Sequence, residues 1–291
     1  MENMNQIFNN KSEKFIDLHL HTISSDGTYA PEKVVRLAQE RGFRTIAITD
    51  HDTTEGLEEA ISAGIKYNIE VIPGIELTVD YAQTEMHILG YFINKDSSAF
   101  QNILLDLRET RLNRAIKMAE KLKELGISIP IQKIISVNCE SAIGRLHIAN
   151  ALISEGYVSN INEAMSRYLR KGRPAYVPKK HLLPSEGIKL IKDVGGVAVL
   201  AHPGMGNLER FLPALIEFGM EGIEVFHSKH NEGQIKKYLH LADEYKLLIT
   251  GGSDCHGLGK DQELLGTIHL PEKYLIQLKD YYTKKGLQAK I

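Results

Sequence analysis

The sequence predicts an α/β protein, a distorted (β/α)7-type barrel with a helical insertion domain. Two observations predict this class. Short apolar runs alternate with helical segments of about 10–15 residues at both ends of the chain, which is typical of parallel β/α units. The middle of the chain contains almost no strand-like run. We therefore predict a discontinuous barrel over 15–96 and 181–285, interrupted by a helical insertion over 97–180.

The first barrel segment consists of alternating strand and helix signals. A helix is expected from Pro31 to Arg41, because proline is favoured in a first helical turn and Gly42 can end the helix. A second helix is expected over 54–67, where apolar residues recur at helical spacing. The strands expected around these helices are FIDLHLH (15–21), RTIAITDH (44–51), EVIPGIEL (70–77) and MHILGYFI (86–93).

The insertion and the second barrel segment follow from the same signals. One long amphipathic helix is expected over 99–126, and a loop over 170–184 should lead back to the barrel. Shorter helices are expected between them, over 146–154 and 161–169. The alternation then resumes with a helix over 185–193 and strands over 196–203, 221–227 and 246–256.

Composition and charge restrict the class of protein. The chain of 291 residues is 43% hydrophobic and 25% charged, with a formal net charge of −2, so overall charge favours neither nucleic acid nor membrane. An anionic substrate therefore needs local cations. The two cysteines, Cys139 and Cys255, provide no disulfide framework, and no apolar run approaches the ~18 residues of a membrane span. We expect a cytoplasmic protein with no membrane partner and no obligate protein partner.

Histidine, aspartate and glutamate recur at or near the ends of the predicted strands. Strand alternation places His19 and His21 on one face, about 7 Å apart. Because the carboxyl ends of barrel strands meet at one rim, the recurring side chains are expected to share one volume. A single histidine is often a structural group, but burying the whole set without a cation would be costly. The candidate metal ligands are His19, His21, Asp26, His51, Glu76, His87, His202, Asp254 and His256.

The number and type of these donors indicate more than one ion. A first-row metal ion takes about four to six ligands, so the set suits two or three ions that share a bridging carboxylate. Nitrogen and oxygen donors without thiolate favour Mn²⁺, Fe²⁺ or Zn²⁺, and Cys255 is expected to pack rather than bind metal. Metal ions about 3.5–4 Å apart hydrolyse phosphate esters and can also hydrolyse amides, so the pattern alone leaves the substrate open.

The ordered motifs resemble the polymerase and histidinol phosphatase (PHP) family. The resemblance begins at DLHLHTISSDG and continues through TDHD, PGIELT, HILGY, LAHP and GGSDCHG, so it covers nearly the whole chain. It implies a distorted β/α barrel, two or three metal ions (commonly manganese) and phosphoester hydrolysis. It also implies a first ion held by His19, His21, Glu76 and Asp254, a second by Asp26, His51 and His202, and a third beside Glu76 and His87. These ligands, His87 excepted, are the residues that it implies for catalysis.

The insertion refines this resemblance. Its segments GRLHIANAL and RKGRPAYVP are similar to bacterial nucleoside-phosphate phosphoesterases, which include a 3′,5′-nucleotide bisphosphatase and an exoribonuclease that trims RNA from its 5′ end. We expect attack of a metal-bound hydroxide on phosphorus in a small nucleotide such as pAp, in a short 5′-phosphorylated RNA, or in both. Histidinol-phosphate phosphatase and amide hydrolysis are the alternatives, whereas a non-enzymatic metal-bound module would be expected to lack part of the ligand set.

Candidate substrate contacts come mainly from the insertion. Arg108, Arg111 and Arg114 recur every three residues, and the last two share a helix face. Arginine binds two phosphate oxygens at once, although a run of charges is often only a solvated face. Arg145 lies in a segment that resembles the family's substrate-contacting loop. Asn113 is a candidate for contact with a ribose or a base edge.

Several further residues have two interpretations. His227 and His230 follow a predicted strand and serve either as packing groups or as contacts to the leaving group, including general acid. Arg173 belongs either to a lid over the substrate or to the plain surface. The remaining histidines are interpreted as structural or solvated: His181, His240 and His269.

Overall fold

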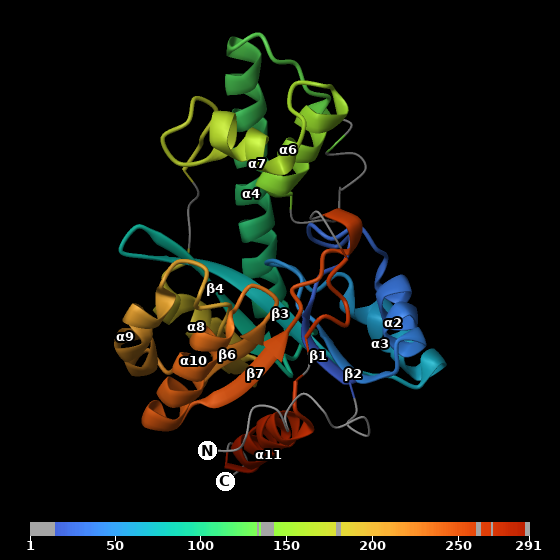
Figure 1. Ribbon diagram of the computed structural model, residues 1–291, viewed down its shortest axis with the longest axis vertical. Helices are drawn as coiled ribbons and strands as arrows, with labels where there is room; N and C mark the ends of the chain where they lie inside the picture. Colours follow the sequence, from blue (N-terminus) through green and yellow to red (C-terminus); the bar gives the residue numbers. More distant parts are fainter. Residues whose placement is uncertain are drawn as a thin grey trace.

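The computed structural model describes residues 15–132, 134, 143–178, 182–259, 263–268 and 270–288. Its strands form one seven-stranded sheet in chain order. They are β1 (Phe15–Leu20), β2 (Phe43–Ile48), β3 (Glu70–Tyr81), β4 (Thr84–Tyr91), β5 (Val197–Leu200), β6 (Gly222–His227) and β7 (Leu248–Gly252). A parallel bridge between Leu20 and Cys255 joins the two edges, so the sheet curls into a nearly closed barrel (Figure 1). The predicted α/β barrel is confirmed.

The barrel closes because glycine allows the first and last strands to approach. A Cβ atom at Gly252 would lie 2.4 Å from both the backbone nitrogen and the Cβ of His19, so only glycine fits there. The backbone of Asp254 then donates a hydrogen bond to the carbonyl of His19 (2.9 Å). This contact places the chain after β7 directly beside β1, where the candidate ligands begin.

The fourth strand departs from the parallel pattern. β4 runs antiparallel to both β3 and β5, whereas the other neighbouring strands are parallel. Ala82 and Gln83 connect β3 to β4 with φ values of 49° and 64°, which is the geometry of a two-residue hairpin. Because the hairpin extends β3 to Tyr81, Glu76 lies inside its strand. The prediction that Glu76 sits at a strand end was wrong.

Helices cover the outside of the barrel. α2 and α3 pack on each other and against β2 and β3, α8 lies on β3, β4 and β5, and α10 and α11 cover β6, β7 and β1. Their bounds are α2 (Pro31–Glu40), α3 (Leu57–Tyr67), α8 (Pro184–Asp193), η2 (Leu208–Phe211), α9 (Leu212–Glu217), α10 (Glu232–Tyr245), η3 (Gly257–Gly259) and α11 (Glu272–Gln288). Strand residues such as Leu18, Ile46 and Val199 are completely buried beneath this layer. The core therefore fixes the strands from which the rim loops start.

The insertion rises from the barrel on one long helix (Figure 1). Its elements are α4 (Ser98–Glu124), α6 (Arg145–Ser154), α7 (Ile161–Ala164) and the π-helix η1 (Met165–Leu169). The first turns of α4 belong to the barrel core through Phe100 and Leu104. Its later turns join a second apolar cluster with α6, in which Met118 and Leu152 are buried. α4 thus connects the two parts, and the division at 97–180 stays a prediction.

No helix among the described residues combines the length and the apolar character needed to cross a membrane. Cys139, His181 and His269 lie outside the described residues.

Candidate metal centre and substrate cavity

The candidate ligands gather at one rim of the barrel, although they come from almost every strand. His19 lies in β1, and His21 and Asp26 follow it. Glu76 and His87 lie inside the β3–β4 hairpin, where Glu76 pairs with Leu89 and His87 with Thr78. The other ligands lie in loops directly after strands: His51 after β2, His202 after β5, and Asp254 and His256 after β7. The structure brings together the metal-ligand set that the sequence predicted.

Glu76 is the centre of this arrangement. Its side chain is completely buried. Its two oxygens lie within 3.2 Å of a ring nitrogen of five histidines: His19, His21, His51, His87 and His202. Burial alone would raise the pKa of Glu76, but the surrounding histidines, His51 first, outweigh burial and hold the pKa well below its usual range. Glu76 is therefore an ionised carboxylate that can bridge ions.

The first potential metal site lies between β1 and β7. The ligand atoms of His19, His21, Glu76 and Asp254 all lie within 4.8 Å of one another. Nε2 of His21 is 3.1 Å from both Oε2 of Glu76 and Oδ1 of Asp254. This is the group that the family resemblance implied for one ion.

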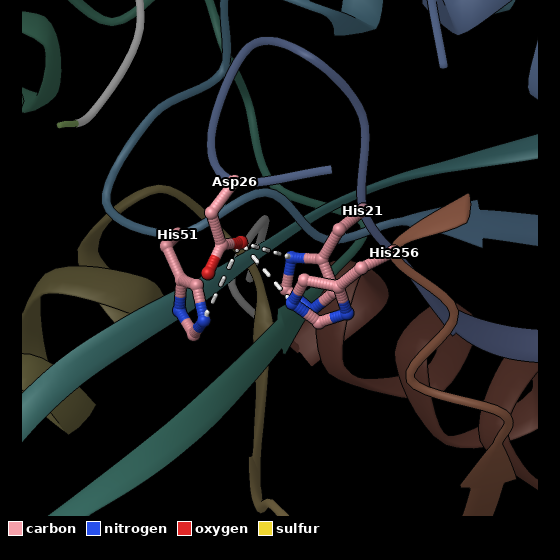
Figure 2. Close-up of side chains that lie close together, drawn as sticks. All are labelled: His21, Asp26, His51 and His256. Atoms are coloured by element: carbon pink, nitrogen blue, oxygen red, sulfur yellow. Dashed lines mark ion pairs between the residues drawn. The ribbon is translucent and has the colours of Figure 1, made fainter. Parts of the chain in front are cut away.

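The second potential site surrounds Asp26 (Figure 2). Its Oδ1 atom lies 3.1 Å from Nε2 of His256 and 4.0 Å from ring nitrogens of His21 and His51. The resemblance had instead implied His202 as the partner of Asp26 and His51. The reason for the difference is strand order, since His256 follows β7, which packs against β1, and the carbonyl of His256 accepts the backbone N–H of Thr28 in the loop that carries Asp26.

The third potential site lies at the hairpin. Ligand atoms of His51, Glu76 and His87 gather within 4.8 Å. His202 belongs here by distance, because its Nε2 lies 2.9 Å from Oε1 of Glu76 and 3.2 Å from Nδ1 of His87. β5, which precedes His202, pairs with β4, which carries His87.

The side chains at the rim fit bound cations. Among the described residues, several buried atoms here have no hydrogen-bond partner: Nε2 of His19, both ring nitrogens of His21, Nδ1 of His51, Oε2 of Glu76 and Nδ1 of His202. Each such atom costs about 1–3 kcal/mol when it is left unsatisfied in a protein interior. Burial also lowers the pKa of His51 well below its usual range, so this ring is neutral and able to ligate. Imidazole and carboxylate donors suit divalent first-row ions.

Glu224 is a candidate site residue that the sequence reasoning missed. It is completely buried in β6, where its Oε1 lies 3.0 Å from Nδ1 of His19 and its Oε2 accepts a hydrogen bond from the backbone of His202 (2.7 Å). Burial would raise the pKa of Glu224, but the neighbouring histidines, His19 first, lower it. The ionised carboxylate holds the proton of His19 on Nδ1 and leaves Nε2 to face the ligand group. The available signal was an acidic residue within the apolar run EGIEVF.

Three rim residues have strained backbones. Asp52, His202 and Asp254 have φ values of 52°, 27° and 55°, in the left-handed region that non-glycine residues rarely adopt. Such conformations cost about 1–3 kcal/mol and concentrate at functional sites. Here the left-handed backbone directs two candidate ligands, His202 and Asp254, toward the rim, together with Asp52, which follows His51.

A cavity of about 380 Å³ lies between the rim and the insertion. From the barrel it is lined by Asp26, His51, Thr78, Glu85, His87 and Lys229, and from the insertion by Arg111, Arg114, Gly144, Arg145, Leu146, Ile161, Asn162 and Met165. Candidate metal ligands and four cationic side chains therefore share one cavity. Lys229 is a cation that the sequence reasoning did not select.

The arginines of this cavity are held in place by the protein. Nε of Arg111 donates to Oδ2 of Asp52 (2.6 Å), and Nε of Arg114 donates to the carbonyl of Val177 (2.8 Å). Burial lowers the pKa of Arg114 to about 10, and the nearby charge of Arg145 contributes to this. At neutral pH the guanidinium remains charged, so the cavity presents fixed cations.

Two predicted substrate contacts lie elsewhere. Asn113 is exposed on α4, outside the described lining of the cavity. The ring of His230 donates from Nδ1 to the carbonyl of Val225 (2.8 Å) and accepts the backbone N–H of Gly204 at Nε2 (3.2 Å). These two hydrogen bonds indicate a packing role for His230. Substrate contact by Asn113 or His230 stays an untested prediction.

Comparison with known proteins gives a consistent result. A model of the PHP domain family matches residues 17–249. A 3′,5′-nucleoside bisphosphate phosphatase of Chromobacterium violaceum is 34% identical over 252 residues, 84% of this chain and 88% of the relative. A phosphoribosyl 1,2-cyclic phosphate 1,2-diphosphodiesterase of Eggerthella lenta is 32% identical, covering 83% and 94%. The 5′-3′ exoribonuclease Rnm of Escherichia coli is 32% identical, covering 82% and 84%.

Solved structures agree with the fold. A chain from Bifidobacterium adolescentis, whose name assigns it to the metal-dependent phosphoesterases, superimposes with a TM-score of 0.84 and 30% sequence identity. The similarity covers 91% of this chain and 95% of that chain. The relatives share phosphate-ester substrates by name, while the alcohol parts of those substrates differ.

Proposed function

This chain belongs to the PHP family of metal-dependent phosphoesterases, a family of hydrolases, and we propose that it removes one phosphate from a nucleotide that carries a second. A nucleoside 3′,5′-bisphosphate such as pAp is the substrate that we favour. The observation that carries this proposal is the shared cavity, in which Asp26, His51 and His87 lie together with Arg111, Arg114, Arg145 and Lys229. A substrate with one phosphate needs fewer cations than this cavity provides.

The rim would hold the metal ions. We assign one ion to His19, His21, Glu76 and Asp254, and a second to Asp26, His51 and His256, on the basis of the distances between their ligand atoms. Glu76, His87 and His202 are the candidates for a third. When bound, divalent ions supply Lewis acidity that activates water and neutralises charge on the reacting phosphate.

The arginines are the groups that we assign to the second phosphate. Arg114 donates to the carbonyl of Val177 and Arg145 donates to Glu85, and the other N–H groups of these guanidinium groups are the donors that we assign to the substrate. A guanidinium pairs with two phosphate oxygens at once, so it fixes the orientation of the nucleotide as well as its charge. Correct orientation brings the other phosphate to the rim.

His227 is the group that we assign as hydrogen-bond donor to the leaving oxygen. Its Nδ1 atom accepts the backbone N–H of Lys229 (3.1 Å), so the proton of the neutral ring lies on Nε2. Nε2 lies 3.6 Å from Oδ2 of Asp254, at the edge of the ligand group. During hydrolysis the oxygen of water would bond to phosphorus and the ester P–O bond would break. The leaving oxygen would take up the proton that the attacking water releases, while the Nε2–H of His227 donates a hydrogen bond to it.

The test uses protein stripped of metal by a chelator and then dialysed. Addition of Mn²⁺ is expected to restore release of inorganic phosphate from pAp, and the Asp26→Ala and His202→Ala variants are expected to stay inactive. Histidinol phosphate is measured on the same preparation and should give a lower kcat/KM. Full activity of both variants, or preference for histidinol phosphate, would overturn the proposal.

A further inference from the structure

Lys229 is a cation of the substrate cavity whose place in the reaction is still open. The three arginines that line this cavity come from the insertion, whereas Lys229 lies in the barrel, in the loop between β6 and α10. In the sheet, β6 lies between β5 and β7, and the loops after those two strands carry the candidate ligands His202 and Asp254. The loop of Lys229 therefore starts between two loops that carry candidate metal ligands.

Hydrogen bonds fix the backbone of this loop. The backbone N–H groups of Lys229 and His230 donate to Nδ1 (3.1 Å) and to the carbonyl (2.9 Å) of His227. The ring of His230 joins the loop to both of its neighbours, because it donates to the carbonyl of Val225 in β6 (2.8 Å) and accepts the backbone N–H of Gly204 after β5 (3.2 Å). A Cβ atom at Gly204 would lie 2.8 Å from Cδ2 of His230, so the two loops are closely packed. What can adjust to a ligand is the long side chain of Lys229.

Lys229 differs from the arginines in its partners and in its side of the barrel. Arg111 pairs with Asp52 and Arg145 pairs with Glu85, whereas Lys229 forms no ion pair with any residue in the described part of the chain. Asp52 follows β2 and Glu85 lies in β4, and neither strand is a neighbour of β6. The ammonium group of Lys229 is therefore available to an anion, and it approaches the cavity from another part of the rim than the arginines do.

We propose that Lys229 is a catalytic residue that binds a nonbridging oxygen of the reacting phosphate, while the arginines of the insertion bind the second phosphate. An ammonium group is a compact charge with three donors on a flexible stem, so it can follow an oxygen that moves as the bonds to phosphorus change. Charge on the nonbridging oxygens must be stabilised throughout that change. The proposal rests on the proposed function, because a phosphate ester must first bind at the rim.

The experiment measures kcat and KM of the Mn²⁺-loaded full-length protein on pAp and on adenosine 3′- and 5′-monophosphate, which each lack one phosphate. Lys229→Met is expected to lower kcat for pAp about 10²-fold with little change in KM, which is typical of losing one donor to the reacting group. The mononucleotide that the wild-type protein hydrolyses should show the same loss. Arg114→Met should instead raise KM for pAp at least about tenfold and leave that mononucleotide unchanged. Lys229→Arg should keep kcat within about tenfold of wild type, because it retains the charge.

The matched control is Lys236→Met, which removes an exposed cation from α10, outside the lining of the cavity. It should change neither kcat nor KM. Bound metal per chain, measured by mass spectrometry, should be the same in Lys229→Met and wild type. The assignment of Lys229 is overturned, while the proposed function stands, if Lys229→Met keeps full kcat, loses only KM for pAp, or loses its metal together with its activity. A wild-type protein that releases no phosphate from pAp would overturn the proposed function itself.

Discussion

The barrel rim and the insertion both supply charged side chains to one cavity, yet they hold them in opposite ways. At the rim, Nε2 of His19 and both ring nitrogens of His21 are buried beside carboxylates and, among the described residues, find no hydrogen-bond partner. In the insertion, Arg111 and Arg145 already pair with Asp52 and Glu85. The rim therefore depends on cations from outside, whereas the insertion is ordered by the chain itself. Metal removal should accordingly affect the rim, and ion-pair removal the insertion.

The largest effect is expected when the centre of the rim loses its charge. Glu76→Gln keeps the shape of the side chain but replaces a carboxylate that lies near five histidines. Phosphate release should fall at least about 10³-fold, because several kcal/mol of metal-dependent stabilisation are lost. Bound metal per chain, measured by mass spectrometry after dialysis, should fall as well. Retention of both metal and activity would show that Glu76 bridges no ion.

The next largest effect is expected on stability, when the ion pair between Arg111 of the insertion and Asp52 of the rim is removed. Arg111 is buried, donates to Asp52 (2.6 Å) and also donates to Oγ1 of Thr78 (2.7 Å). Arg111→Met leaves the buried carboxylate of Asp52 without this partner, and the free energy of unfolding should fall by about 3 kcal/mol in urea titrations of metal-free protein. Asn113→Ala, an exposed change two residues along the same helix, should stay within about 0.5 kcal/mol. Equal losses in both variants would contradict the assigned role of the pair.

This comparison also explains how far the sequence could be interpreted. Strand alternation and the rule that barrel strands meet at one rim are local signals, and they were sufficient to select the candidate ligands, from His19 to His256, that gather at the rim. The direction of β4 was not predictable in this way, because its turn, Ala82–Gln83, lacks the glycine that usually marks such a hairpin. The pairing of Arg111 with Asp52 was not predictable either, because the two residues are 59 positions apart in the chain. Pairings between distant residues are set by packing, which spacing along the chain does not show.

The smallest effect is expected when Glu224, which contacts the candidate ligands His19 and His202, loses its charge. Glu224→Gln retains the volume of the side chain and can still accept the backbone N–H of His202, but it removes the charge that orients His19. Loss of such a supporting group typically costs about 10- to 100-fold in metal affinity, so titration calorimetry with Mn²⁺ should show a weaker Kd while KM for substrate at saturating metal changes little.

The chain offers a matched control for this substitution. Glu221 precedes the same strand, and its carboxylate accepts from the backbone of Ala198 (2.9 Å) and pairs with Lys285 (2.8 Å), at the end of the strand away from the rim. Glu221→Gln should lower the unfolding temperature and leave the Kd for Mn²⁺ unchanged. If both substitutions weaken metal binding equally, the effect reflects general loosening of β6, and the charge of Glu224 has no specific role in orienting His19.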